Sequence, residues 1–575
     1  MSRSARRRPR SRSAAGVIAI ALGLIGLAVN PAQAAPLHVN CDAGGNLQNK
    51  INAAPGGATI LVKGTCDGPF SIGFKSLTLK GNPTATLDGQ GATTTLSVVA
   101  TGKTVNLVDL VVTGGRTTGQ GGGIFVDDGT LNLLRTTVRG NQVNASQNSY
   151  GGGISILGAG TLTLTSSRVI GNQALTEPAA GYAYSHGGGI YAEVPVTLDH
   201  TTVGGNTSRA TSSDMYAYAY GGGIEAGTLV LTASLLKNNI SKAQAQSDFA
   251  YAYGGAVETG TLTASGTTIS NNRAVSKSDT DFVYAYGGGL DINGGGTTLA
   301  RTKVIGNRAS ADGAFFAYAY GGGINQTGQL TLEHSSVNGN HAVAHSSTDD
   351  ANAFGGGIEI YNGDLALRRS TVGRNEASAL APAGDASAYG AGVQGNQAVA
   401  ATNSTVASNV GNAASGGSGS TGDAAGGGID ALDITLVNAT VADNDSGASG
   451  DSFMEIGGGV HATASLTTKA SILAANDADS GPECFATTTS QGYNLVQHTA
   501  ECLAAPRPSD VTGMPAMLGT LTSNGGPTQT MAIPTTSNAF NKIPAAACAV
   551  PFDQRGVARP QGPRCDVGAY ERRVP

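Results

Sequence analysis

The sequence predicts an all-β protein built as a parallel β-solenoid, in which short strands form a stack of similar coils. Glycine accounts for 86 of 575 residues and only 13% of residues are charged, a composition unsuited to helix bundles or coiled coils. The hydrophobic content of 40% is enough to bury a core, which argues against intrinsic disorder. A repeat of 30 to 36 residues fills the middle of the chain, and periods of this length are typical of stacked architectures.

The first 34 residues have the layout of a secretory signal peptide. Six arginines between Arg3 and Arg12 precede an apolar run from Ala14 to Val29, and small residues follow up to Ala34. The run is shorter than the ~20 residues of a membrane span, so we expect cleavage there and a secreted, extracellular protein without a membrane span. Because these six arginines are among the 34 basic residues, 28 remain against 39 acidic residues, a net charge of −11. That charge argues against nucleic acid as a partner.

Six cysteines lie only in the two end regions of the chain. An even number in an exported protein indicates disulfides, and no spacing matches the Cys-x2-Cys of a zinc site. Pairing sequence neighbours is one of 15 connectivities and closes the shortest loops. The pairs would be Cys41 with Cys66, Cys484 with Cys502 and Cys548 with Cys565.

Each repeat carries two signatures in a fixed order. The first is a Gly-Gly-Gly triplet or near variant followed by Ile, Val or Leu, as at Gly221. We expect it at corners, where Gly permits positive φ and close backbone approach. The second is an Asn, which suits a turn in the left-handed conformation and can form a ladder with its equivalents in neighbouring coils. The alternating sequence between the two signatures predicts short strands. The Asn residues are Asn141, Asn172, Asn206, Asn239, Asn272, Asn307, Asn340, Asn375, Asn409, Asn444 and Asn476.

The repeats resemble those of polymorphic outer-membrane proteins and their bacterial relatives, in which Gly-Gly-Ala-Ile alternates with Phe-x-x-Asn. That resemblance implies a pectin-lyase-like, right-handed parallel β-helix with capped first coils. Three segments of the tail resemble the tail of the choice-of-anchor Q proteins. They are Leu521 to Thr530, Asp553 to Gly556 and Cys565 to Glu571. The implied domains are a signal peptide (1–34), a cap with the first coils (35–120), about eleven repeats (121–476) and a choice-of-anchor Q-like region (477–575). No anchoring segment follows Glu571, so we expect release into the medium.

The repeats also contain a surplus segment, between the Asn and the next Gly triplet, in which aromatic residues alternate with Ala. Residues 215–220, Met-Tyr-Ala-Tyr-Ala-Tyr, are an example. Alternation places the aromatics on one face of an extra strand, and stacking of coils then makes an aromatic ladder. The ladder is interpreted either as a self-stacking stripe or as a platform for sugars or another protein. The candidate ligand-binding residues are Tyr216, Tyr218, Tyr220, Tyr251, Tyr253, Tyr284, Tyr286, Tyr318 and Tyr320.

A column of polar residues follows the first apolar residue after each triplet. Within it, Glu225, Glu258 and Asp291 should point outward about 5 Å apart in successive coils. Like charges at that distance raise each other's pKa unless a cation neutralises them. These three residues are therefore candidate ligands for Ca²⁺. The alternatives are paired carboxylates for glycosidic cleavage and a solvated acidic face.

A third column contains the bases Arg135, His200, Arg301, His334 and Arg369. A polysaccharide lyase needs such a base beside its carboxylates, but the spacing of about nine residues places this column on another face. Gly-x-Ser-x-Gly and His-Glu-x-x-His motifs are absent, so no catalytic residue is assigned and no cofactor is required. We expect a non-catalytic binding, adhesion or surface-interaction protein, with a polysaccharide or cell-surface partner. The alternative is a carbohydrate-active enzyme, either a polysaccharide lyase or a glycoside hydrolase.

Overall fold

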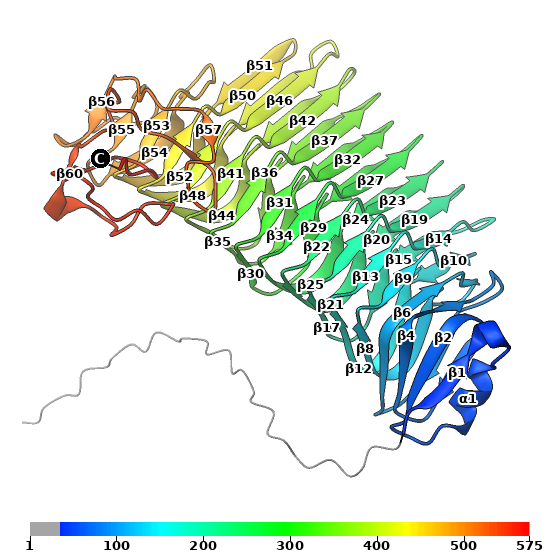
Figure 1. Ribbon diagram of the computed structural model, residues 1–575. Helices are drawn as coiled ribbons and strands as arrows, with labels where there is room; N and C mark the ends of the chain where they lie inside the picture. Colours follow the sequence, from blue (N-terminus) through cyan, green and yellow to red (C-terminus); the bar gives the residue numbers. More distant parts are fainter. Residues whose placement is uncertain (1–34, 574–575) are drawn as a thin grey trace, which may run out of the picture.

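The computed structural model describes residues 35–573, and in it the chain forms a rod of stacked coils (Figure 1). The all-β, parallel solenoid expected from the repeats is confirmed, because the strands of each coil pair in parallel with equivalent strands of the next. Residues 1–34, the predicted signal peptide, lie outside the described residues. Helical segments are few in the described chain: η1 (Cys41–Ala43), α1 (Leu47–Ala53) and η2 (Ala545–Ala547). Helix α1 covers the N-terminal end of the rod with Leu47 and Ile51 buried.

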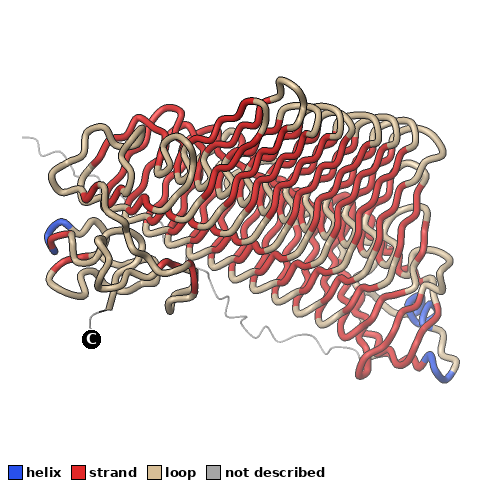
Figure 2. Tube along the Cα trace, turned by 90° about the horizontal axis from the view of Figure 1, so that it is seen from above, coloured by secondary structure: helices blue, strands red, loops and turns tan. Residues whose placement is uncertain are grey.

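One coil contains four strands, and the coils are in register along the rod (Figure 2). The coil that starts at Gly221 consists of β21 (Ile224–Thr232), β22 (Leu235–Lys237), β23 (Ile240–Ala245) and β24 (Ala250–Tyr253). The first two belong to a main sheet, β23 to a second sheet and β24 to a third sheet.

The other strands of the main sheet enclose the solenoid core, and several coils split the first strand in two. They are β1 (Leu37–Asn40), β2 (Thr59–Asp67), β3 (Phe70–Gly73), β4 (Leu77–Asp88), β5 (Leu96–Val99), β6 (Thr104–Thr113), β8 (Ile124–Leu134), β9 (Thr137–Arg139), β12 (Ile154–Thr165), β13 (Arg168–Ile170), β16 (Ile190–Ala192), β17 (Val196–Asp199), β18 (Thr202–Gly204), β25 (Val257–Ser265), β26 (Thr268–Ser270), β29 (Leu290–Ile292), β30 (Thr297–Ala300), β31 (Lys303–Ile305), β34 (Ile324–Thr327), β35 (Leu330–Glu333), β36 (Ser336–Asn338), β39 (Ile358–Tyr361), β40 (Leu365–Arg368), β41 (Thr371–Gly373), β44 (Val393–Thr402), β45 (Thr405–Ala407), β48 (Ile429–Val437), β49 (Thr440–Ala442), β52 (Val460–Lys469), β53 (Ile472–Ala474), β54 (Cys484–Ser490), β55 (Leu495–Val496) and β56 (Val511–Thr512).

The second and third sheets run the length of the repeats beside the solenoid. The second sheet also contains β7 (Arg116–Thr117), β10 (Gln142–Ala145), β14 (Gln173–Thr176), β19 (Thr207–Ser212), β27 (Arg273–Ser278), β32 (Arg308–Gly313), β37 (His341–Ser346), β42 (Glu376–Ala381), β46 (Val410–Ser415) and β50 (Asp445–Ser449). The third sheet also contains β11 (Asn148–Tyr150), β15 (Ala183–His186), β20 (Ala217–Tyr220), β28 (Val283–Tyr286), β33 (Ala317–Tyr320), β38 (Ala351–Phe354), β43 (Ala386–Tyr389), β47 (Thr421–Ala425) and β51 (Ser452–Ile456).

The surplus segment of each repeat thus forms two strands, where the sequence predicted one extra strand. In β23 and β24 the buried residues are small, and Ala243, Ala245, Ala250 and Ala252 have no exposed surface. Equivalent alanines of the other coils form a second hydrophobic cluster, separate from the Ile, Leu and Val core of the solenoid. The second and third sheets therefore pack face to face through alanine, and the aromatic side chains of the third sheet lie on its outer surface.

The corners confirm the predicted role of the Gly triplet. Gly221 has a φ of +49°, and a Cβ on Gly222 would lie 2.3 Å from the carbonyl carbon of Ile240. A side chain therefore does not fit at the second position, and the first position favours Gly for its backbone conformation.

The Asn ladder is also confirmed, and its members are buried. The Nδ2 atom of Asn239 donates to Oδ1 of Asn272 at 2.9 Å, and the backbone N–H of Asn239 donates to the same oxygen at 3.0 Å. The bonds repeat from Asn141 to Asn476, which donates to Glu483 Oε2 at 2.7 Å. The expectation that Asn takes the left-handed conformation is wrong, because that position is the preceding residue, such as Asn238 with a φ of +56°. Asn239 itself has to direct its N–H along the ladder.

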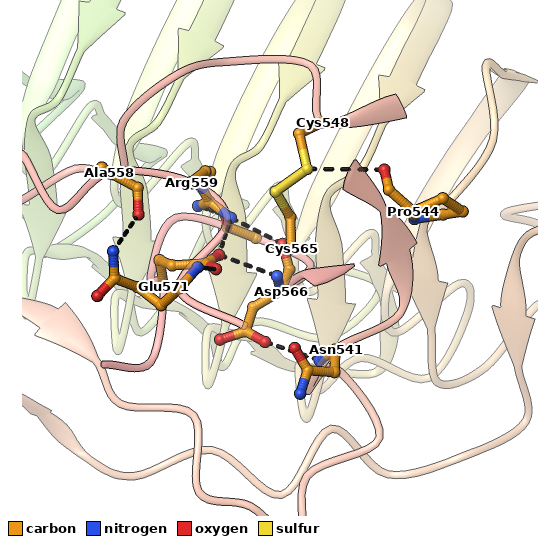
Figure 3. The surroundings of a disulfide bond; sticks show 10 residues. Asn541, Pro544, Cys548, Ala558, Arg559, Cys565, Asp566 and Glu571 are labelled. Carbon is orange, nitrogen blue, oxygen red and sulfur yellow. Dashed lines mark hydrogen bonds and ion pairs between the residues drawn. A yellow bond between two sulfur atoms is a disulfide. The ribbon is translucent and has the colours of Figure 1, made fainter. Parts of the chain in front are cut away.

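The three disulfides join sequence neighbours, as predicted: Cys41–Cys66, Cys484–Cys502 and Cys548–Cys565. The last one lies in a tail that contains two short antiparallel ribbons, β57 (Leu521–Thr522) with β58 (Thr530–Met531) and β59 (Ile543–Pro544) with β60 (Arg564–Cys565). Beside it, Arg559 Nη1 donates to Glu571 at 3.0 Å (Figure 3).

This tail folds back over the last coils of the solenoid. Thr371 Oγ1 in β41 donates to the carbonyl of Gln529 at 2.6 Å, and Thr405 Oγ1 in β45 donates to Gln554 Oε1 at 2.6 Å. Gln554 is fully buried. The C-terminal region thus covers the short strands β41 and β45 as well as the end of the rod.

Candidate ligand-binding site

The aromatic residues of the third sheet form the ladder that the sequence predicted. All nine candidate tyrosines lie in it, in columns that run along the rod. In the middle column, Tyr218 stacks on Tyr251 and Tyr251 on Tyr284, each pair with ring centroids 4.9 Å apart and planes within 5°. We call the column next to the Gly triplets the corner column. Its members are Tyr150, His186, Tyr220, Tyr253, Tyr286, Tyr320, Phe354 and Tyr389.

The ladder leaves little ring face free for a ligand. Tyr251 has Tyr218 on one face and Tyr284 on the other, and Tyr253 lies beside it at 6.3 Å. Only the ring edge with its hydroxyl remains for solvent. This geometry favours the self-stacking interpretation, worth ~0.5–1.5 kcal/mol per pair, for the rings in the middle of the ladder.

The acidic column lies on the first strand of each coil, with the predicted register. Glu225 of β21 pairs with Glu258 of β25, and Glu258 pairs with Asp291 of β29. Each carboxylate has a separate partner. Glu225 accepts from His186 Nδ1 at 3.0 Å, Glu258 from Asn293 Nδ2 at 2.5 Å, and Asp291 from Asn325 Nδ2 at 2.6 Å.

The corner column and the acidic column meet at the Gly corner, which turns the chain from the third sheet into the main sheet. Between them lies a cavity of about 310 Å³, which we call the corner cavity. Asp291 and Glu359 line it and are only 1% and 5% exposed. Its other lining residues are Tyr253, Tyr286, Asn293, Tyr320, Asn325, Thr327 and Tyr361.

Asp291 and Glu359 each have one buried carboxyl oxygen, Oδ2 and Oε2 respectively, without a hydrogen-bond partner in residues 35–573. Burial raises the pKa of Asp291 to about 7, against the hydrogen bond from Asn325 that lowers it. Burial also raises the pKa of Glu359 well above its ordinary value, with a smaller contribution from Asp430. The alternative of a solvated acidic face, stated for Glu225, Glu258 and Asp291, therefore does not describe Asp291.

The pKa values of the neighbouring ionisable groups are raised as well. Burial, followed by the charges of Glu225 and Asp291, raises the pKa of Glu258 well above its ordinary value. Burial is also the main cause of the raised pKa of Tyr253, Tyr286 and Tyr320. The cavity therefore holds neutral hydroxyls and carboxyl groups that resist ionisation.

The residues proposed for metal binding and for proton transfer do not converge. In residues 35–573 no three His, Cys, Asp or Glu side chains are grouped to hold a metal ion, so Ca²⁺ stays a prediction from the sequence. The third column consists of turn residues with positive φ, such as Arg301 at +48° and His334 at +50°. The column does not line the corner cavity.

Sequence reasoning missed the corner cavity, although it named both columns that form it. The signal was the short distance along the chain between them, since Tyr286 and Asp291 are five residues apart across a tight Gly corner. Three residues of the cavity were not assigned to a ligand-binding or metal site from the sequence: Asn293, Glu359 and Tyr361. Tyr361 follows Glu359 by two positions in β39, so both side chains lie on the same face of that strand.

Within the part of the chain that the structure describes, no helix is both long and apolar enough to cross a membrane. Comparisons with protein-family models, curated proteins and solved structures each found no match.

Proposed function

We propose that this chain is an exported, non-catalytic β-helix protein that binds an extended polysaccharide at the corner cavity. The observation that carries the proposal is a pair of carboxyl groups, Asp291 and Glu359, that line a cavity together with tyrosines and each have a buried oxygen without a partner in residues 35–573. Buried polar atoms are rarely left without a partner unless a ligand or water supplies one.

The chemistry of the lining supports a carbohydrate as the ligand. Carboxyl and amide groups from Asp291, Glu359, Asn293 and Asn325 lie beside the rings of the corner column. A few fixed polar groups among aromatic side chains are typical of sites that orient a small polar ligand. Because corner-column rings repeat about every 5.0 Å, a polymer lying along the rod would meet similar groups in successive coils.

One feature favours binding over cleavage. The corner cavity has no Lys, Arg or His in its lining, and these are the side chains from which the base of a polysaccharide lyase is expected.

The resemblance of the repeats supports a pectin-lyase-like, right-handed β-helix, and that of the tail supports a choice-of-anchor Q region. Export is supported by the layout of the first 34 residues and by three disulfides, which form and persist in oxidising compartments.

The test is a polysaccharide array probed with the mature protein, with and without Ca²⁺, and read for both bound protein and released products. We expect binding to one glycan class without product release. The double variant Asp291→Asn/Glu359→Gln should lose that binding, while Glu333→Gln, an exposed acid at the end of β35, should keep it. Product release that disappears in the double variant would establish the enzyme alternative. Binding that survives in the double variant would remove the corner cavity from the proposal.

A further inference from the structure

The corner cavity has acceptor oxygens without donors. Asp291 Oδ1 accepts from Asn325, but Asp291 Oδ2 and Glu359 Oε2 accept from no group in residues 35–573. The two residues lie in β29 and β39, two coils apart along the rod, with Asn325 of β34 between them. When these carboxyl groups are ionised, a ligand that fills this space has to supply hydrogen-bond donors more than acceptors.

The ionisable side chains that line the cavity are all acids or tyrosines. Glu258 of β25 faces Asp291 from the preceding coil, and Glu359 lines the same cavity from β39. The groups that face them from the third sheet are Tyr253, Tyr286 and Tyr320. The His186 ring pairs with Glu225 instead. The lining contains no cationic side chain, so a cation that stabilises the ionised form of these acids has to come with the ligand.

The stacked tyrosines offer a ligand their ring edges. The rings of Tyr253, Tyr286 and Tyr320 stack on one another at 5.0 Å, so their faces are covered, and Tyr361 lines the same cavity. A metal ion is a poorer match, because it needs several converging oxygens and residues 35–573 contain no group of three His, Cys, Asp or Glu side chains that could hold one.

We infer that the corner cavity binds the primary ammonium group of an amine-bearing saccharide, such as a polymer of hexosamine units without N-acetyl groups. This inference rests on the proposed function and names its ligand class. An ammonium group supplies three N–H donors, no acceptor and one positive charge. It therefore provides both the donors that the carboxyl oxygens lack and the cation that the lining lacks. An N-acetylated sugar presents one N–H donor and a neutral carbonyl acceptor at the same position.

Proton release distinguishes this ligand from a neutral one. The pKa of Asp291 is raised to about 7 by burial, so part of the free protein holds a proton there near neutrality. An ammonium group favours the ionised form and lowers that pKa, so its binding expels the proton. Glu359, which lines the cavity, and Glu258, which lies beside Asp291 in the preceding coil, respond in the same direction. A neutral saccharide causes no such release.

The experiment is isothermal titration calorimetry of the mature protein with glucosamine oligomers and N-acetylglucosamine oligomers of equal length, near the pKa of Asp291. Two buffers of different protonation enthalpy report the protons released. We expect the free-amine oligomer to bind at least about tenfold more tightly and to release protons. The Asp291→Asn and Glu359→Gln variants should each lose that preference, whereas Glu333→Gln keeps it. Circular dichroism of each variant establishes that it is folded.

Three outcomes would overturn the inference in different ways. Equal binding of both oligomers without proton release removes the ammonium assignment and leaves the proposed function intact. A simple alkylamine that binds as tightly as the glucosamine oligomer removes the saccharide part. If neither oligomer binds and the array finds no other glycan, the proposed function fails together with the inference.

Discussion

At the scale of single residues, the Asn at the turn of each coil belongs to a buried chain of hydrogen bonds that runs from coil to coil. Asn272 donates to Asn307 and accepts from Asn239, at 2.9 Å in both cases, and its own surface is fully buried. Removing one amide leaves donors or acceptors of two neighbouring coils without partners. The ladder therefore fixes the spacing between consecutive coils and also fills the corner.

Replacement of Asn272 by Ala should lower the free energy of unfolding by ~1–3 kcal/mol, because it leaves buried polar groups unsatisfied. The measurement is urea-induced unfolding of the protein. The matched control is Asn144→Ala, which changes an exposed Asn on β10 and should stay within ~0.5 kcal/mol of the parent. Equal effects of the two substitutions would contradict a structural role for the ladder.

Asp291 should make the protein less stable as the pH rises. Below pH ~4 this group is protonated in both the folded and the unfolded chain. Above that pH the unfolded chain ionises first, while the folded chain keeps its proton up to a pKa of about 7. Stability is therefore lost between these limits, by as much as ~4 kcal/mol for this group.

The check is the free energy of unfolding as a function of pH for the parent and for Asp291→Asn. The variant should show a smaller decline between pH ~4 and ~7, the window of the shifted group. Glu333→Gln, which changes an exposed acid, should decline like the parent. A decline of the same slope in Asp291→Asn would mean that Asp291 is ionised in the folded protein.

At the scale of elements, the second and third sheets form a narrow extension whose thickness is set by alanine. Ala243 and Ala252 are fully buried between β23 and β24. The aromatic residues alternate with these alanines and lie outside. The same sequence pattern thus specifies a thin interior and a stacked outer surface.

A larger side chain should not fit between these sheets. Ala252→Leu should destabilise the protein by ~1–3 kcal/mol or more, because overpacking a close-packed interior forces side chains and backbone to shift. Lys242→Leu, on the outer face of β23, is the matched control and should change stability by less than ~0.5 kcal/mol. Thermal unfolding monitored by circular dichroism compares them, and an unchanged Ala252→Leu would show that the alanine interior is loosely packed.

The elements that sequence reasoning predicted are those with strict periodicity. The Gly triplet at Gly221 and the ladder residue Asn239 recur once per coil, and stacking follows directly from that recurrence. The second sheet was missed because Ser241 and Ala243 of β23 give only a weak alternation of small residues. The burial of Asp291 could not be predicted either. The periodicity places it outward from its strand, and only the turn at the Gly corner brings Tyr286 over it.

At the scale of the whole molecule, the rod is closed at both ends and partly along one side. Helix α1 and the Cys41–Cys66 disulfide lie at the first coils, and the Cys484–Cys502 disulfide lies at the last ones. The tail then covers the short strands near the C-terminal end. Such covering prevents the open edges of a sheet from pairing with other chains.

Reduction of the three disulfides should therefore produce oligomers before the central coils unfold. The loosened end coils expose unpaired strand edges, whereas the central coils contain no cysteine. Size-exclusion chromatography and circular dichroism under increasing reductant follow the two events. A reduced protein that unfolds as a monomer would contradict the protective role of the end regions.

The central claim is that a polysaccharide binds at the corner cavity, and a crystal structure of the mature protein with the saccharide selected on the array tests it most directly. The claim predicts sugar density beside Asp291 and Glu359, bordered by the rings of Tyr286 and Tyr320, with donors directed at the two carboxyl oxygens that lack partners. Sugar density over the outer edges of the tyrosine ladder, with an empty corner cavity, would contradict it.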